Sequence, residues 1–183
     1  MKKILGFTGP IGSGKDLAAK YVGEKLRIPF FQISDALKKL MEKRGVEVNR
    51  DTFTTCGTEY AKEFGEDYLA KILLEKIDGG KGVISGMRQV AQIKYLRENS
   101  DFYLVAIGAD AEIRFQRSMA RGKAGDADTL DLFVRNELKE NTAEKNIQRV
   151  FECVKMADIL IINNTSLEDL YKELDELLVK IDF

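Results

Sequence analysis

Short runs of apolar residues alternate along the chain with longer segments in which apolar residues recur every three or four positions. The runs are typical of buried β-strands, and the recurrence is typical of helices with one buried face. Strands are predicted at residues 4–8, 28–33, 82–85, 102–107 and 159–162. Because these runs are apolar at consecutive positions, both faces of the sheet should be covered. The pattern predicts a doubly wound, three-layer α/β fold with five parallel strands.

Segments with helical periodicity connect the predicted strands. The first has apolar residues at positions 17, 18, 21, 22 and 26 on one face. Further helices are predicted at residues 35–44, 51–64, 66–77 and 90–99, in segments that begin near 111, 129 and 144, and after the N-cap Ser166. The three consecutive helices between residues 35 and 77 have no strand among them, so we expect an insertion at one edge of the sheet.

Composition limits the size of the fold and its partners. With 183 residues, of which 44% are hydrophobic, the chain has material for one core, and we expect a single domain over residues 1–183. The 29 basic and 30 acidic residues leave a formal net charge of -1. This balance provides no general polycation, so neither a nucleic acid nor a membrane surface is an expected partner.

The residue types present also restrict the chemistry. The sequence contains no histidine, which excludes Ser-His-Asp hydrolysis, imidazole acid–base catalysis and histidine-ligated metals. Cys56 and Cys153 stand alone without metal-ligand spacing and are expected to be packing residues. The apolar runs at 4–7 and 102–109 are too short for a signal peptide or a membrane span. We therefore expect a soluble protein of the reducing cytoplasm.

A glycine-rich motif lies between the first predicted strand and the first predicted helix. It matches the pattern G-x-x-x-x-G-K of nucleotide phosphate loops, and its residues are Gly9, Pro10, Ile11, Gly12, Ser13, Gly14 and Lys15. Glycines let the backbone turn its N–H groups toward phosphate oxygens, the helix presents its positive dipole end, and the lysine reaches the β and γ phosphates. The motif predicts a binding site for a nucleoside triphosphate.

The residue after the lysine departs from this motif. Ser or Thr usually follows and binds Mg²⁺ through its hydroxyl, whereas this chain has Asp16 and then Leu17, both of which we include in the predicted nucleotide site. A carboxylate binds Mg²⁺ but repels phosphate, and an acidic residue in the first turn of a helix interacts favourably with the helix dipole. Asp16 is therefore a candidate metal ligand, with a helix-start role as the alternative.

Two later motifs resemble the acceptor side of the P-loop nucleoside monophosphate kinases, the family of adenylate kinase and its relatives. The segment from Asp35 to Lys38 resembles the Asp-x-Leu-Arg motif that opens the monophosphate-binding helices. The segment from Ser85 to Arg88 resembles Asp-Gly-x-Pro-Arg, and Gln92 stands where adenylate kinases carry the glutamine that reads the acceptor base. Asp35 has helix N-capping as its alternative role.

The donor side of the same family is matched as well. Arg117 and Arg121 resemble the arginines that open the mobile lid, and Arg135 stands where the returning lid helix would supply another. The segment Asn163, Asn164 and Thr165 resembles the loop that packs on the donor adenine. Each arginine alone has a solvated helix position as its alternative, but the four motifs occur in the family order over nearly the whole chain.

The resemblance implies a division of the chain and a set of roles. Residues 35–77 would form the acceptor-binding subdomain and residues from 117 to about 135 the lid. ATP would be the donor, Mg²⁺ the metal and a small-molecule nucleotide the acceptor, in a monomer or a homodimer. The implied catalytic residues are Lys15, Arg88, Arg117, Arg121 and Arg135, and the implied acceptor-binding residues are Asp35, Lys38, Arg50, Arg88 and Gln92.

Two positions depart from the family pattern. Lys38 replaces the phosphate-binding arginine, and Ser85 replaces the aspartate that helps to hold Mg²⁺. We hypothesise that the carboxylate directed at Mg²⁺ has moved from position 85 to Asp16, because both positions should lie beside the β and γ phosphates. Within the family, the stretch 49–52 together with Gly57 resembles small archaeal and bacterial kinases of the dephospho-coenzyme A kinase-like or deoxynucleotide kinase-like kind.

The favoured function is therefore ATP-dependent phosphorylation of a nucleoside or deoxynucleoside monophosphate. Such catalysis depends on alignment and on cations around the moving phosphoryl group, a role to which arginine is suited. A dephospho-coenzyme A kinase is the alternative among enzymes. A regulatory module or slow ATPase that binds ATP without an acceptor is the alternative outside them, because positions 16 and 85 lack their usual residues.

Overall fold

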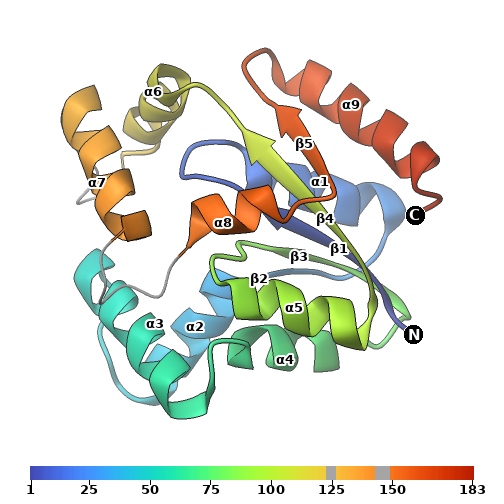
Figure 1. Cartoon of the computed structure of the whole chain (residues 1–183), viewed down its shortest axis with the longest axis horizontal. Coiled ribbons are helices and arrows are strands. Elements are labelled where there is room, and N and C mark those ends of the chain that lie inside the picture. Colours follow the sequence, from blue (N-terminus) through green and yellow to red (C-terminus); the bar gives the residue numbers. More distant parts are fainter. Residues whose placement is uncertain (123–126, 143–148) are drawn as a thin grey trace.

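The computed structural model of this chain describes residues 1–122, 127–142 and 149–183. It contains a five-stranded sheet in the order β2-β3-β1-β4-β5, and all neighbouring strands are parallel (Figure 1). The strands are β1 Lys3–Thr8, β2 Phe30–Gln32, β3 Lys81–Ser85, β4 Asp101–Gly108 and β5 Ile159–Ile162. The predicted parallel sheet is confirmed.

Helices cover both faces of the sheet. The helices α1 and α9 pack on one face, and α5, α8 and the group α2 to α4 lie on the other (Figure 1). Their bounds are α1 Lys15–Leu26, α2 Ile33–Lys43, α3 Arg50–Phe64, α4 Tyr68–Glu75, α5 Val90–Asn99, α6 Ala111–Arg121, α7 Leu130–Thr142, α8 Val150–Lys155 and α9 Leu167–Lys180. Each face has its own buried apolar cluster, which confirms the three-layer α/β class.

The second strand is shorter than predicted. Its apolar run begins at Ile28, but the N–H of Ile28 donates to the carbonyl of Gly23 and so closes the end of α1. Arg27 adopts the left-handed conformation at this helix end. At the other end of the run, Ile33 is already the first residue of α2. The predicted start of that helix at residue 35 is two residues late, because apolar content alone does not separate a strand from the helix that follows it.

The other boundaries follow local capping. Asn49 and Thr52 form a reciprocal capping box that starts α3 one residue before the predicted position. Ser166 forms a similar box with Asp169 and caps α9, as predicted. The helix predicted from residue 144 corresponds to α8, which begins later, at Val150 after the N-cap Arg149, and residues 143–148 lie outside the described residues. None of the helices in the described ranges is both long and apolar enough to cross a membrane.

Candidate functional site

The phosphate loop joins the carboxyl end of β1 to the start of α1, and close packing forces its shape. Gly12 and Gly14 have φ values of 79° and 95°, a region that side chains rarely adopt. A Cβ on Gly12 would lie 2.5 Å from the carbonyl oxygen of Arg114, and one on Gly14 would lie 2.5 Å from Nδ2 of Asn163. The motif therefore adopts the wrapped backbone that its glycines predict.

Two side chains from distant elements hold the carbonyl groups of this loop. Nδ2 of Asn163 donates to the carbonyl of Ser13 at 2.8 Å, and Nη1 of Arg114 donates to the carbonyl of Ile11 at 3.3 Å. The first N–H groups of α1 have no acceptor within the helix, so they are available to a ligand. Oγ of Ser13 is completely buried and has no hydrogen-bond partner within the described part of the chain. Such an orphaned hydroxyl fits a loop built to receive oxygen atoms.

Lys15 is the first residue of α1 and is only 6% exposed. Burial lowers the pKa of its ammonium, the nearby carboxylate of Asp16 raises it, and the charges of Arg88 and Arg121 lower it further. The net shift is downward. The charges of three cationic side chains therefore act on one another at this site, and Asp16 compensates only part of them, which favours the binding of an anion.

Asp16 connects the phosphate loop to the end of β3. Its Oδ2 lies 3.4 Å from Nζ of Lys15, and its Oδ1 accepts a hydrogen bond from Oγ of Ser85 at 2.5 Å. Burial raises the pKa of this carboxyl, but the charge of Lys15 and the Ser85 hydrogen bond outweigh burial and lower it overall. Asp16 is therefore ionised at neutral pH. Asp16, which departs from the phosphate-loop motif, and Ser85, which departs from the family pattern, are in direct contact.

The loop after β3 carries Arg88 and is fixed through its backbone. The N–H of Gly86 donates to the carbonyl of Phe7, and Oγ1 of Thr8 donates to the carbonyl of Met87 at 2.8 Å. The carbonyl of Arg88 accepts a hydrogen bond of 2.7 Å from the N–H of Arg149. This loop is thereby joined to β1 on one side and to the start of α8 on the other.

A pocket lies between the phosphate loop, the Arg88 loop and the helices α2 to α4. It encloses about 620 Å³ including space open to solvent. Charged residues line one end and apolar residues of the helical group line the walls. The lining residues are Lys15, Asp16, Ile33, Ser34, Leu37, Phe53, Gly57, Thr58, Leu69, Gly86, Arg88, Gln89 and Gln92.

Two predicted acceptor residues do not line this pocket. Asp35 and Lys38 form an ion pair of 3.4 Å on the exposed face of α2, where their side chains are 56% and 46% exposed. Asp35 does not cap α2, whose N-cap is Gln32. Arg50 is the first residue of α3, and its side chain lies outside the described part of the chain. Acceptor binding by these three residues stays a prediction.

The predicted lid arginines lie on α6 and α7. Nη1 of Arg117 donates to the carbonyl of Asn163 at 2.9 Å, so Arg117 is tied to the loop after β5. Arg121 lies close enough to Lys15 to lower its pKa, and its guanidinium is 3.5 Å from Oγ of Ser118. Arg135 pairs with Asp131 at the surface. Residues 123–126 of the predicted lid lie outside the described residues.

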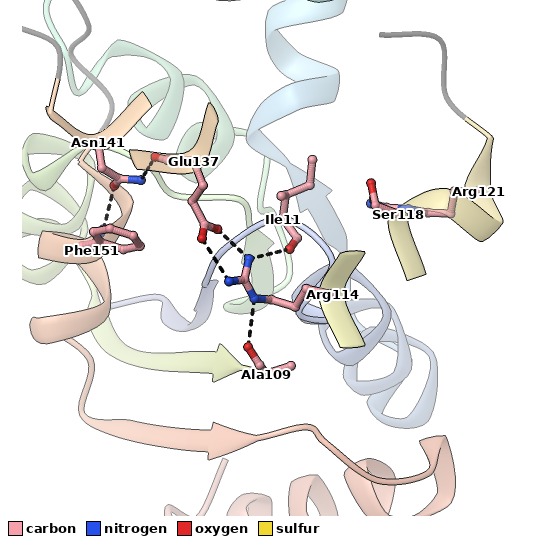
Figure 2. Close-up of polar contacts among 8 residues, drawn as sticks. All are labelled: Ile11, Ala109, Arg114, Ser118, Arg121, Glu137, Asn141 and Phe151. Atoms are coloured by element: carbon pink, nitrogen blue, oxygen red, sulfur yellow. Dashed lines mark hydrogen bonds and ion pairs between the residues drawn. The ribbon is translucent and has the colours of Figure 1, made fainter. Parts of the chain in front are cut away.

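Arg114, which the family motifs do not include, makes the most extensive polar contacts in this region. Its guanidinium binds both carboxylate oxygens of Glu137 on α7, at 2.6 and 3.0 Å, and its Nε donates to the carbonyl of Ala109 at 2.8 Å (Figure 2). Arg114 is 7% exposed. The side chain of Asn141 then donates to the carbonyl of Glu137 and accepts from the N–H of Phe151. This network joins the phosphate loop to α7 and α8.

The three residues predicted to contact the donor adenine differ in their exposure and in their hydrogen bonds. Asn163 is 4% exposed and supports Ser13, as described above. Oδ1 of Asn164 accepts a hydrogen bond from the N–H of Asp110, and Thr165 is exposed. The side-chain amide of Asn163 thus binds the backbone of the phosphate loop. The adenine contact of this segment stays a prediction.

Comparison with known proteins places the chain among archaeal relatives. A UPF0200 protein of Methanosarcina barkeri is 31% identical over 182 residues, which cover 96% of this chain and 94% of the relative. A UPF0200 protein of Methanocaldococcus jannaschii is 26% identical over 183 residues, covering 97% and 90%. No family model matches the chain.

Among solved structures, shikimate kinase from Acinetobacter baumannii in complex with shikimate has a TM-score of 0.62 with this chain. The match covers 98% of this chain and 94% of that kinase at 16% sequence identity, a level at which the likeness concerns the fold alone. The fold is therefore that of the P-loop kinases. The identity to the Methanosarcina barkeri protein over almost the full length of both chains shows that this protein belongs to the UPF0200 family.

Proposed function

We propose that this protein is a kinase that transfers the γ-phosphoryl group of ATP to a nucleoside or deoxynucleoside monophosphate. The observation that carries the proposal is that Lys15 of the phosphate loop and Arg88 of the loop after β3 line the same pocket. A donor phosphate on the loop and an acceptor phosphate on Arg88 would then meet across a short distance. Alignment of this kind is the main requirement of phosphoryl transfer.

The residues of the phosphate loop fit the phosphates of ATP. The unsatisfied Oγ of Ser13, the free N–H groups at the start of α1 and the buried ammonium of Lys15 all suit oxygen atoms that carry negative charge. Bound ATP would supply the transferable phosphoryl group, and Mg²⁺ would neutralise charge on it. Lys15, Arg88 and Arg121 would bind and orient the phosphates and stabilise charge during transfer.

Asp16 is the residue that fits Mg²⁺. Its carboxylate is ionised, 44% exposed and held in place by Ser85, and Mg²⁺ in proteins commonly uses one or two carboxylates together with phosphate oxygens and water. No group of three or more acidic or cysteine side chains in the described ranges is arranged as a metal site by itself. The proposed ion therefore depends on the phosphates of the bound nucleotide as well as on Asp16.

The walls of the pocket favour a planar base over a polyhydroxylated acceptor. Leu37, Phe53 and Leu69 are apolar, and among the pocket residues Asp16 is the single carboxylate. Shikimate, the ligand of the Acinetobacter baumannii kinase, carries several hydroxyl groups and a carboxylate, each of which needs a polar partner when it is buried. A nucleobase buries two apolar faces and needs polar partners only along its edge. This difference supports a nucleotide acceptor.

The test is a screen for acceptor-dependent ADP formation with Mg²⁺ and ATP. The acceptors are the common ribonucleoside and deoxyribonucleoside monophosphates, dephospho-coenzyme A and shikimate. We expect ADP to form rapidly with one or a few monophosphates and slowly without an acceptor. Rapid ADP formation with dephospho-coenzyme A or shikimate alone would identify a different kinase. ADP formation that no acceptor accelerates would refute the proposed transfer and identify an ATPase or a nucleotide-binding module.

A further inference from the structure

Two glutamines three residues apart follow Arg88 at the start of α5. Gln92 is 2% exposed and Gln89 is 7% exposed. Oε1 of Gln92 accepts a hydrogen bond from the backbone N–H of Arg88 at 3.1 Å, and Nε2 of Gln92 donates to Oε1 of Gln89 at 2.9 Å. Both ends of the Gln92 amide are therefore engaged within the protein.

The direction of these hydrogen bonds is fixed by the backbone of Arg88. An N–H group can only donate, so the Gln92 atom that faces it must be the amide oxygen, and the Gln92 nitrogen must face Gln89. That nitrogen donates, so Gln89 must turn its own oxygen toward Gln92. Within the described part of the chain, Nε2 of Gln89 has no hydrogen-bond partner.

Gln89 lines the pocket, so its amide nitrogen is available as a donor to a molecule bound there. The nearby hydroxyls of the pocket are engaged as donors elsewhere. Oγ1 of Thr58 donates to the carbonyl of Thr54 at 3.1 Å, and Oγ of Ser34 donates to Oε1 of Gln32 at 3.3 Å. Of the three neutral side chains Ser34, Thr58 and Gln89, Gln89 is therefore the one that has a donor left for a bound molecule.

Gln92 affects the site in a different way, because it binds the backbone of Arg88. The backbone N–H of Arg88 is bound by Gln92 and its carbonyl by the N–H of Arg149. With both backbone groups held, the direction in which the Arg88 side chain leaves the loop is fixed. Removing the Gln92 amide would leave a buried N–H without a partner and allow Arg88 to shift.

We propose that Gln89 reads the base of the acceptor nucleotide and that Gln92 is a positioning residue for Arg88. The base recognised by Gln89 presents a carbonyl oxygen or an unprotonated ring nitrogen to Nε2. This inference rests on the proposed function. It reverses the role that the adenylate kinase resemblance implies for Gln92, since the Gln92 amide is already engaged.

The test compares Gln89→Leu and Gln92→Leu with the parent protein. The readouts are kcat/KM for each nucleoside monophosphate and the inhibition constant of ribose 5-phosphate, which has the phosphate but no base. Gln89→Leu should reduce the discrimination among bases by about fivefold, the effect of one neutral hydrogen bond, and leave ribose 5-phosphate inhibition unchanged. Gln92→Leu should lower kcat/KM for every acceptor and weaken ribose 5-phosphate inhibition by about tenfold, because a contact to a charged group is disturbed.

Gln92→Glu gives a further check. Its carboxylate still accepts from the Arg88 N–H, so ribose 5-phosphate inhibition should recover relative to Gln92→Leu. A carboxylate does not donate, so Gln89 should turn its nitrogen toward Glu and its oxygen toward the pocket, which changes the ranking of bases. A role of Gln92 in packing alone would give the recovery but not the new ranking, because Glu has nearly the same size and shape as Gln.

The outcomes separate the inference from the proposed function. If the parent phosphorylates monophosphates but Gln89→Leu keeps the same ranking of bases, the inference is wrong and the function stands. The same holds if Gln92→Leu changes the ranking and leaves ribose 5-phosphate inhibition intact. If Gln92→Leu fails to fold, the Gln89→Leu result alone decides the role of Gln89. The role of Gln92 is then decided by Gln92→Glu, which should keep the ribose 5-phosphate inhibition of the parent and change the ranking of bases. If the parent phosphorylates no monophosphate, function and inference fall together.

Discussion

The buried ion pair between Arg114 and Glu137 gives a sharp test of how α7 is attached to the rest of the protein. The side chains of Arg114 and Glu137 are only 8% and 11% exposed, and the guanidinium also lies 5.5 Å from the ring centroid of Phe133. The substitution Glu137→Gln keeps the size of the side chain and removes its charge. Arg114 would then remain charged and buried without its counter-ion, so we expect the protein to be less stable.

The magnitude follows from the contacts that remain. Removing one partner of a buried ion pair costs about 3–5 kcal/mol. The substitution leaves an amide oxygen for one Arg114 N–H, and the carbonyls of Ala109 and Ile11 still accept from the same guanidinium, so we expect about 3 kcal/mol. For a chain of this length each kcal/mol lowers Tm by roughly 2–4 °C, which gives a decrease of roughly 6–12 °C.

A matched control exists on the same helix. Asp131 pairs with Arg135 at 2.9 Å, but both side chains are about 70% exposed, so Asp131→Asn should cost roughly 0–1 kcal/mol. Urea unfolding followed by circular dichroism, with the slope m fitted for each variant, measures both changes. Equal losses of stability in the two variants would refute the reasoning, because they would mean that burial of the Arg114 pair adds nothing.

Three further predictions concern single side chains. Lys15→Met should lower kcat by about two or more orders of magnitude in a protein that still folds, since a charged contact to the transferring group supplies about 3–4 kcal/mol. Turnover close to that of the parent would contradict the proposed role of Lys15. Asp16→Ser should raise the Mg²⁺ concentration that half-saturates ATP binding, measured by calorimetry. Adding Ser85→Asp should restore much of the lost Mg²⁺ affinity, with a coupling energy between the two substitutions above about 0.5 kcal/mol. Burial raises the pKa of the Cys153 thiol from 9.0 to about 12, so the thiolate forms more readily in the unfolded chain than in the folded one. The free energy of unfolding should therefore fall as pH rises above 9.0. Cys153→Ala should reduce that slope in urea titrations at increasing pH, and an unchanged slope would count against a buried neutral thiol.

The fold was predictable because its signals are local. The bounds of α5 and β5 agree with the predicted ranges, since each segment has a consistent apolar pattern between polar residues. The error at β2 has a physical cause, because Ile28 is apolar but its N–H closes the end of α1. An apolar residue at a helix end and one in a strand have the same side chain, so only the hydrogen bond distinguishes them.

The site was predictable only where it is continuous in sequence. Residues 9–15 are contiguous and adopt the wrapped backbone that the motif predicts. The motif predicts acceptor binding by Asp35, and this stays a prediction, since α2 begins at Ile33 and presents Asp35 to solvent beside Lys38. The pairing of Arg114 with Glu137 joins residues 23 positions apart on separate helices, and no local pattern indicates which of several acidic residues is the partner.

The two amide side chains of the site show what a motif omits. Asn163 and Gln92 were expected to contact the donor adenine and the acceptor base, and both lie beside the loops concerned. In the structure the Asn163 amide donates to the carbonyl of Ser13, and the Gln92 amide accepts from the N–H of Arg88. The spacing of a motif predicts that a residue lies near a ligand. The direction of its hydrogen bonds decides whether it binds the ligand or the backbone next to the ligand. Because both amides bind backbone, removal of the amide at Asn163 or Gln92 should affect all donors or all acceptors alike, whereas a substitution that changes a contact to the base should change the preference among them.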